Sequence, residues 1–294
     1  MLTTLFTPSY VGDLERAVWM RRSVRRFQKQ PLRHVIAVPT QDRMQFGQAF
    51  ADDDLVQLVE QQEVVSSRFY PRWFYPLVQR LVPQAQHWRF ERHEGRIGWI
   101  VQQIVKLSCS RWISDGAVAM VDSDLVFTRP FGPDDLGITD STRTLLRITP
   151  EHESSRHRRH LLMSRDLLGL PPGSSEHHYM GSPAIWYVDW LRALQQHLAQ
   201  RAAGDWQQPL YAAVDISEYT IYGLFVEEVL KPAGLVARTA PFHHIVYDLE
   251  TFRQLMAGRQ DLDPLRERCL TLVVQSNLGL PVAAYRDILD AIIN

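Results

Sequence analysis

Apolar runs that stop at proline divide the first part of the chain into strands and a helix. Residues 2–7 are apolar or β-branched and stop at Pro8, which predicts a first strand. Residues 13–27 place apolar side chains at helical spacing behind an acidic N-cap, and residues 33–38 form a second apolar run that also stops at proline. A strand, a helix and a strand within about forty residues form a βαβ unit, which predicts a parallel sheet with a right-handed crossover.

The same pattern extends the α/β class to the rest of the chain. Residues 99–107 have the apolar spacing of a buried helix, and residues 117–127 form an apolar strand that two acids interrupt. The run Asp52–Asp54 is expected to open a helix, because acids favour a first turn. Further expected elements are a strand at 63–67, strands within 142–149 and 240–247, a basic loop at 151–160, and helices at 161–168, from about 186 to 198, 217–230, 249–256 and 285–293.

Composition excludes several classes of protein. The 294 residues include 32 basic and 33 acidic ones, so no global field would attract nucleic acid. Two cysteines are too few for a disulfide framework or a zinc site. No window approaches the roughly 20 apolar residues that span a bilayer, and the N-terminus lacks the pattern of a signal peptide. We therefore expect a cytoplasmic protein, soluble or peripheral at a membrane.

The strongest chemical signal is an apolar strand that runs into Asp122 and Asp124, which flank Ser123. Ionised groups at the end of a buried strand need a partner. Two such carboxylates can converge on one hard cation and leave positions open for phosphate oxygens. The pattern predicts a divalent metal held against a diphosphate, and the alternative is a turn with two solvated acids. Lys106, in the preceding helix, either points toward the diphosphate or is a surface lysine.

Basic residues gather in two stretches. Arg21, Arg22, Arg25 and Arg26 crowd the second half of the first helix, where they either complement the helix dipole or contact anionic phosphates. Residues 68–90 interleave arginines with aromatic residues. This composition suits an anionic acceptor, a membrane surface or a loop packed on the core.

Two later segments offer further polar groups. Ser217 or Asp215 is expected to cap a helix whose first turn contains Glu218, which is either a capping charge or a general base. His243 and His244 lie on a late strand that only helices are expected to follow. Adjacent strand residues point to opposite faces, so one of the two could complete the metal shell.

Together these residues resemble a GT-A-type nucleotide-sugar glycosyltransferase. The resemblance covers residues 2 to about 247 and depends on the segment Leu5–Tyr10, the strand Val35–Pro39 with Asp42, the helix Trp99–Leu107 and the strand end Val121–Asp124. More narrowly, the chain is similar to a little-characterised group of bacterial surface-polysaccharide transferases. That group pairs a Gln-Gln-X-X-Lys-Leu helix, here Gln102–Leu107, with the Asp-X-Asp strand, and it has a Ser-Glu-Tyr-X-X-Tyr-Gly segment, here Ser217–Gly223.

The resemblance implies a GT-A-like, Rossmann-type α/β fold with a mostly parallel sheet flanked by helices. It implies one domain over residues 1–294, in which residues 1–131 form the nucleotide-binding half and residues 132–294 form the acceptor-binding half with the C-terminal helices. The implied metal ligands for Mn²⁺ or Mg²⁺ are Asp122, Asp124, His243 and His244. The implied contacts of the nucleotide-sugar donor are Thr7, Pro8, Tyr10, Asp42, Lys106, Asp122 and Ser123. The implied acceptor contacts are His178, Tyr179 and Gly181, and the implied catalytic residues are Glu218 and Asp215.

The implied activity is metal-dependent transfer of a sugar from a nucleotide sugar to a glycan or lipid-linked glycan, in bacterial surface polysaccharide synthesis. Such an enzyme of the EC 2.4 class would work in the cytoplasm or peripherally at the inner face of the membrane, with no nucleic acid partner. One alternative is a non-catalytic carbohydrate- or partner-binding domain on the same fold. Another is a metal-dependent nucleotidyltransferase or phosphohydrolase, which would share the Asp-X-Asp pattern.

Overall fold

The computed structural model describes residues 1–65, 80, 97–149, 155–173, 177–202, 204–213, 215–239 and 242–294. Apart from Arg80, the basic and aromatic stretch at 68–90 lies outside the described residues, and so do residues 151–154 of the basic loop. In the described part, no helix is long and apolar enough to cross a membrane.

Over the described residues up to 120, strands and helices alternate, as the apolar pattern predicts. The strands are β1 (Thr3–Pro8), β2 (Arg33–Val38), β3 (Val56–Glu60), β4 (Ala117–Met120), β5 (Leu125–Phe127), β6 (Arg143–Leu146), β7 (Ala184–Tyr187), β8 (Leu235–Arg238), β9 (His243–Val246) and β10 (Thr271–Val274). The α-helices are α1 (Leu14–Phe27), α2 (Arg43–Ala49), α4 (Ile97–Leu107), α5 (Ser155–Leu168), α6 (Val188–Arg201), α7 (Gln208–Ala212), α8 (Glu218–Leu224), α9 (Leu249–Ala257), α10 (Asp263–Arg268) and α11 (Arg286–Ile293). A π-helical segment, Phe225–Leu230, continues α8.

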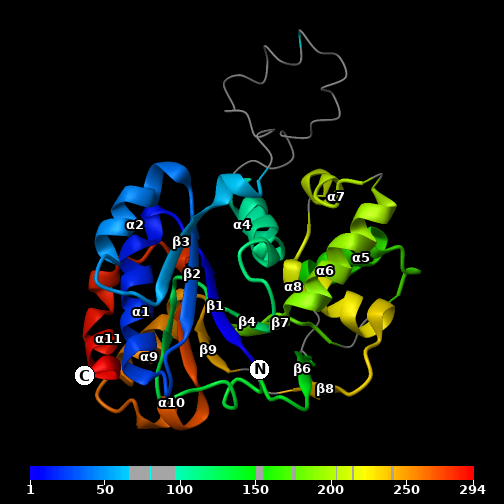
Figure 1. Ribbon diagram of the computed structural model, residues 1–294. Helices are drawn as coiled ribbons and strands as arrows, with labels where there is room; N and C mark the ends of the chain where they lie inside the picture. The colour runs from blue at the N-terminus through cyan, green and yellow to red at the C-terminus, as the bar shows by residue number, and fades with distance from the viewer. Residues whose placement is uncertain are drawn as a thin grey trace.

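A mostly parallel sheet forms the centre of the fold. Its strand order is β3-β2-β1-β4-β7, and only β7 is antiparallel to its neighbour. Both β1 and β4 are buried along their whole length, which is what an apolar run without polar alternation predicts. Figure 1 shows the sheet between α1 and α2 on one side and α4 with α8 on the other. The predicted α/β class with a mostly parallel, helix-flanked sheet is therefore confirmed.

The order of the strands reverses next to β1. The chain passes from β1 outward to β2 and β3, and then returns to the other side of β1 as β4. Phe6 of β1 lies opposite Met120 of β4, so the carboxyl ends of these two strands meet at one edge of the sheet. In open α/β sheets, ligands bind outside the carboxyl ends of the strands at the point where the order reverses. The Asp-X-Asp segment follows β4 at this edge.

A second sheet is built against the first, with the order β5-β10-β9. Only four residues separate β4 from β5, so the turn between the two sheets is formed by the Asp-X-Asp segment itself. The strand that contains His243 and His244 is β9, and β10 follows it. The expectation that only helices come after this strand is therefore wrong, because Thr271–Val274 pairs with both β9 and β5.

Several local expectations differ from the structure. The run Asp52–Asp54 opens no helix, because it lies in the turn between α2 and the edge strand β3, where Asp53 accepts two hydrogen bonds from Arg21. The basic segment at 151–160 is helical from Ser155, and α6 begins at Val188, later than expected, because residues up to Tyr187 pair with β4. Of the strand expected at 63–67, residue 63 ends a 3₁₀ turn that begins at residue 61, and residues 66 and 67 lie outside the described residues.

A buried chain of hydrogen bonds fixes the end of β4. The hydroxyl Oγ1 of Thr7 donates to the carbonyl of Val121 at 2.6 Å and lies 2.8 Å from Nε2 of His34. Because the hydroxyl proton is used on Val121, Nε2 of His34 carries a proton and donates to Thr7. Burial, and then the charge of Arg21, lower the pKa of His34 from 6.5 to about 3. His34 therefore stays neutral and anchors the backbone just before Asp122.

This histidine predicts a pH-dependent loss of stability. Between pH 6.5 and about 3 the unfolded chain binds a proton that the folded protein excludes, so stability falls as the pH falls through this window. At pH 5 the loss is about 2 kcal/mol, at 1.36 kcal/mol per pKa unit. The substitution His34→Gln keeps an N–H donor and removes the titration. Urea unfolding at pH 7.5 and pH 5 should show a loss about 2 kcal/mol smaller in the variant, and equal losses would contradict this role of His34.

Candidate functional site

A buried lysine joins the Asp-X-Asp strand end to the first turn of α8. Lys106 lies in the last turn of α4, and its side chain is 4% exposed. Its Nζ lies 2.8 Å from Oδ1 of Asp122 and 3.0 Å from Oε1 of Glu218, and it donates to the hydroxyl of Tyr219 at 2.8 Å. Tyr219 in turn donates to Oδ2 of Asp122 at 3.3 Å. We call these four residues the lysine cluster.

The lysine cluster holds one positive charge against two carboxylates. Burial alone would lower the pKa of Lys106, but the neighbouring Asp122, Tyr219 and Glu218 raise it well above its ordinary value. Burial, followed by the charge of Asp122, raises the pKa of the Tyr219 hydroxyl. Lys106 is therefore charged and Tyr219 protonated near neutral pH, so the ammonium pairs with the Asp122 carboxylate and the Tyr219 hydroxyl donates to it.

The two sequence segments that carry the family resemblance interlock at this cluster. The side-chain oxygen of Gln103, one turn before Lys106, accepts from the backbone N–H of Glu218 at 2.9 Å. The hydroxyl of Ser217 accepts from the N–H of Thr220, so the predicted cap of α8 is confirmed. Tyr222 accepts from the N–H of Tyr187 at 2.9 Å and thereby ties α8 to β7. Side-chain partners are thus defined for Gln103, Lys106, Ser217, Glu218, Tyr219 and Tyr222.

The glycine that ends the second segment makes room for an aromatic ring. A Cβ on Gly223 would lie 2.1 Å from Cγ of Tyr179, and Tyr179 itself is buried and donates to Oε2 of Glu227 at 2.5 Å. Such a ring cannot move aside without losing this hydrogen bond. Gly223 therefore allows α8 to approach the 177–181 segment.

Gly223→Ala is expected to destabilise the fold by about 1–3 kcal/mol, the usual cost of overpacking a core. Gly47, in α2, provides the control, because a Cβ there meets nothing within 4 Å. Alanine at position 47 should be neutral or stabilise by up to about 1 kcal/mol, since it favours a helix over glycine. Urea unfolding of both variants measures the difference in stability. Similar changes in the two variants would show that the ring of Tyr179 moves aside.

The second acid of the pair lies in a different environment. Oδ2 of Asp124 accepts from the backbone N–H of Ser276 at 3.0 Å. Burial, and then the charge of Asp122, raise the pKa of Asp124 to about 7. Ser123, between the acids, donates to the hydroxyl of Ser9 at 2.9 Å and joins the ends of β4 and β1. The two acids are thus held in fixed positions, and ionising both of them at once is costly unless a cation lies nearby.

A third carboxylate lies at the same edge. Burial raises the pKa of Asp13, and Asp122 contributes to the rise. Asp13 is in the N-cap position of α1, but it makes no capping hydrogen bond and instead accepts from Nη1 of Arg16 at 2.9 Å. The sequence pattern predicts Asp13 only as the N-cap of this helix, and it gives Arg16, Gln103 and Tyr219 no individual role at the site. Tyr219 had a signal, because it stands next to Glu218 in a segment that was recognised.

The structure does not bring the two histidines into a shared shell with the acids. Nδ1 of His243 accepts from the backbone N–H of Ser182 at 3.1 Å. In the second sheet, His243 and Phe127 both lie opposite Thr271 of β10. The carbonyl of Asp124 accepts from the N–H of Val274, three residues further along β10, which is about 10 Å away at the usual strand rise. Over the described residues, no group of three or more His, Cys, Asp or Glu side chains is placed to hold a metal.

The other residues expected around the donor lie at the same edge of the sheet. Thr7 is fully buried and forms the hydrogen bonds described above, and Pro8 is buried as well. Asp42 accepts from the N–H of Val11 at 2.8 Å and so fixes the loop after β1. Tyr10, in that loop, is 53% exposed and is available to a ligand. Thr7 and Asp42 therefore shape this edge, while Tyr10 faces outward from it.

The residues expected around the acceptor, His178, Tyr179 and Gly181, contact residues outside the lysine cluster. The ring of His178 stacks on His157 at 5.0 Å, and burial lowers the pKa of His178 to about 4. Gly181 is buried against Leu146. Asp215 forms an ion pair with Nε of Arg159 at 3.2 Å. Of the two expected catalytic residues, only Glu218 joins the cluster, where its carboxylate is 5% exposed.

Comparisons with known proteins give a family and several structural likenesses. The model of a family of unknown function (DUF6492) matches residues 2–243. Mouse xyloside xylosyltransferase 1 in its apo form is 12% identical, with a TM-score of 0.48 over 96% of this chain and 100% of that one. The galactosyltransferase LgtC with donor and acceptor sugar analogs is 10% identical, with a TM-score of 0.49 over 99% and 96%. The bifunctional glycosyltransferase WbbM is 8% identical, with a TM-score of 0.49 over 100% of this chain and 50% of that one. No curated protein matches the sequence.

Proposed function

The chain belongs to the family of unknown function DUF6492, and we propose that it is a metal-dependent glycosyltransferase. It would transfer a sugar from a nucleotide-sugar donor to a glycan or lipid-linked glycan. The observation that carries the proposal is the position of Asp122 and Asp124, which follow β4 where the strand order reverses. This is where open α/β sheets bind nucleotides.

Acids at a nucleotide site require a cation. A diphosphate carries negative charge and would be repelled by Asp122 and Asp124, so a divalent ion must lie between them. Mg²⁺ is usually held by one or two carboxylates together with substrate phosphates and water, and Mn²⁺ accepts similar oxygen ligands. The donor set fits this description, because Oδ1 of Asp122 is buried and, apart from its ion pair with Lys106, has no hydrogen-bond partner among the described residues. Such an ion would act as a Lewis acid on the diphosphate leaving group.

The lysine cluster positions Asp122 for this task. Lys106 forms an ion pair with Oδ1 of Asp122, and Tyr219 donates a hydrogen bond to Oδ2. Glu218 forms a second ion pair with Lys106. A carboxylate that is paired and nearly buried is poorly placed to take a proton from an acceptor hydroxyl. We therefore assign Glu218 a positioning role, in place of the base expected from the sequence. The acceptor would bind on the side of α8, near the 177–181 segment.

The test is the stabilisation of the protein by a nucleoside diphosphate. At 100 times its dissociation constant, the ligand should stabilise by about 2.7 kcal/mol in Mn²⁺ and not in EDTA. Asp122→Asn should remove this effect. Asp115→Asn is the control, because Asp115 is an exposed acid just before the same strand, at the end far from Asp122. Equal stabilisation of both variants, or stabilisation in EDTA, would reject the metal site.

The product of turnover separates the alternatives. A glycosyltransferase releases a nucleoside diphosphate from a nucleotide sugar, whereas a nucleotidyltransferase or phosphohydrolase releases pyrophosphate or phosphate. Metal-dependent binding of a nucleoside diphosphate without any product would identify a non-catalytic carbohydrate- or partner-binding domain. We further propose that the acceptor belongs to bacterial surface polysaccharide synthesis, which would place the protein at the inner face of the membrane.

A further inference from the structure

Three exposed arginines on α1 take no part in the candidate site. They are Arg22, Arg25 and Arg26. The fourth basic residue of this group, Arg21, is buried and donates to both oxygens of Asp53 at 2.7 and 2.8 Å. The structure therefore explains Arg21 as part of the fold, and it leaves the other three for another role.

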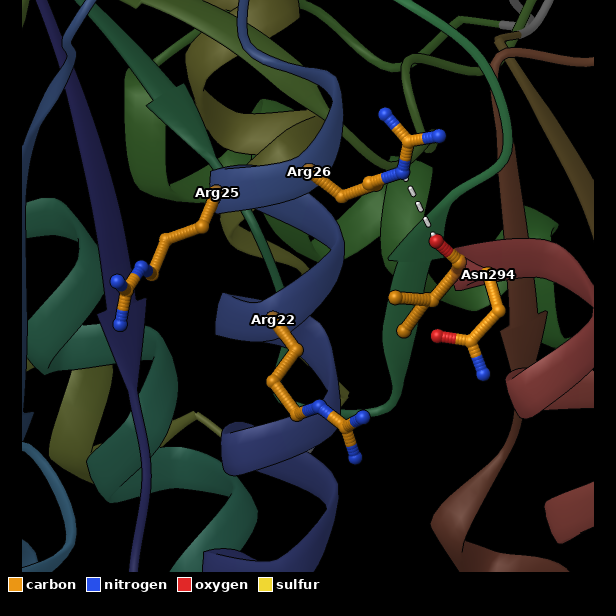
Figure 2. A pocket seen from close by; sticks show the side chains of 5 residues that line it. Arg22, Arg25, Arg26 and Asn294 are labelled. Atoms are coloured by element: carbon orange, nitrogen blue, oxygen red, sulfur yellow. Dashed lines mark hydrogen bonds between the residues drawn. The ribbon is translucent and has the colours of Figure 1, made fainter.

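These arginines line a cavity of about 480 Å³ between α1 and the end of α11, together with Ile293 and Asn294. Figure 2 shows Arg22 and Arg26 extending toward the end of α11, where Asn294 lies, and Arg25 extending to the other side of α1. Nε of Arg26 donates to the carbonyl of Ile293 at 3.0 Å, and no acidic side chain lines the cavity. The terminal nitrogens of Arg26 remain available to a ligand.

Within the described residues, none of the three arginines forms an ion pair with an acid. The guanidinium carbon of Arg22 lies 4.1 Å from the ring centroid of Trp19, and that of Arg26 lies 5.6 Å from Phe27. Such contacts orient a guanidinium and leave its N–H groups free. A planar fork of N–H donors matches the oxygens of a phosphate.

Complementing the helix dipole does not account for this arrangement. The dipole favours cations within the last turn only, which includes Arg25 and Arg26 but not Arg22. Arg22 is three and four residues from the other two, and like charges at this spacing destabilise a helix. An anion bound between the arginines would turn this repulsion into attraction.

We propose that Arg22, Arg25 and Arg26 form a binding site for clustered phosphate groups, here called the arginine site. The chain enters α1 from the carboxyl end of β1 and leaves it toward the amino end of β2, so the arginine site lies at the edge of the sheet opposite to the lysine cluster. A second cavity of about 150 Å³ on the other side of α1 also contains Asp52 and Asp53. Those acids would repel a phosphate, so the anion lies on the α11 side, next to Arg22 and Arg26, and Arg25 adds its positive charge from the other side of α1 (Figure 2). The phosphates are those of phospholipid headgroups or of a soluble phosphate ester.

Pyrophosphate titrated by calorimetry in EDTA tests the site. Without a divalent cation the acids of the candidate active centre repel pyrophosphate, so binding reports the arginines alone and is independent of the proposed activity. The triple variant R22Q/R25Q/R26Q should bind at least tenfold more weakly than the wild-type protein. R253Q/R259Q/R268Q removes three exposed arginines elsewhere and should bind like the wild type. The proposal would be overturned if the two triple variants bound pyrophosphate with equal affinity while circular dichroism showed that both are folded.

Sedimentation with vesicles identifies the source of the phosphates. Phosphatidylcholine vesicles with and without phosphatidylglycerol are mixed with the wild type and both triple variants. Loss of binding to the anionic vesicles only in R22Q/R25Q/R26Q assigns the site to lipid headgroups. Pyrophosphate binding without vesicle binding assigns it to a soluble phosphate ester. Vesicle binding that both triple variants lose equally would reflect net charge and would reject the lipid assignment.

Discussion

Replacing Lys106 by methionine is expected to destabilise the protein by about 3–5 kcal/mol, the usual cost of removing one partner of a buried ion pair. The loss leaves Glu218 buried with a charge that, among the described residues, only Lys106 neutralises. It also frees Oδ1 of Asp122 and removes the donor that orients Tyr219. Urea unfolding measures the change in stability, and Mn²⁺-dependent nucleotide binding should be lost together with it.

Two further variants show whether the charge itself causes the loss. Lys29→Met removes an exposed lysine that lies 2.7 Å from Asp135, and such a surface pair is worth about 0–1 kcal/mol. Adding Glu218→Gln to the Lys106→Met variant removes the stranded carboxylate and should restore much of the stability. Asp122 can remain charged in this double variant, because its side chain is 26% exposed. A Lys106→Met protein as stable as Lys29→Met would refute the proposed role of the lysine.

Secondary structure is predicted best from the sequence where a segment is buried on both faces. The apolar runs of β1, β2 and β4 cannot be mistaken for amphipathic helices, so the βαβ unit and the parallel sheet follow from them. Edge strand β3 is different, since its residues are mostly half-exposed and its preceding acids imitate a helix start. The pairing of β10 with β5 and β9 depends on contacts across the chain that no local pattern contains.

The candidate site could be predicted residue by residue but not contact by contact. Asp122, Lys106 and Glu218 were each picked from the sequence, but nothing local shows that Lys106 and Glu218, 112 positions apart, form an ion pair. That contact changes the interpretation of both, because Lys106 holds carboxylates where a diphosphate was expected. The metal role of His243 and His244 stays a prediction, and the register of β9 offers it no support.

Asp124→Asn is expected to abolish turnover and to leave the fold at least as stable as that of the wild type. The carboxamide keeps an oxygen that can accept from the N–H of Ser276. It removes the charge that would bind the cation, so turnover in Mn²⁺ should fall at least a hundredfold, or by about 3 kcal/mol of barrier. Turnover at the normal rate in Mn²⁺ would exclude Asp124 from the metal site.

The stability of this variant relative to the wild type should depend on pH in a defined direction. Burial and Asp122 raise the pKa of Asp124 to about 7, so the folded protein binds its proton more tightly than the unfolded chain does. The wild type therefore loses stability as the pH rises from about 4 to 7, and the variant does not share this loss. Because the side chain still reaches solvent, we expect a relative gain of about 1–2 kcal/mol at pH 8.

Asp53→Asn is the matched control, because the same substitution there should act in the opposite direction. Hydrogen bonds and the charge of Arg21 outweigh burial and lower the pKa of Asp53, so its ionised form stabilises the fold. Asp53→Asn should therefore destabilise the protein at pH 8 and leave metal binding unchanged. Urea unfolding of both variants at pH 5 and pH 8 measures the two signs. A carboxylate whose removal stabilises the protein and stops turnover is kept for function, whereas one whose removal only destabilises is kept for the fold.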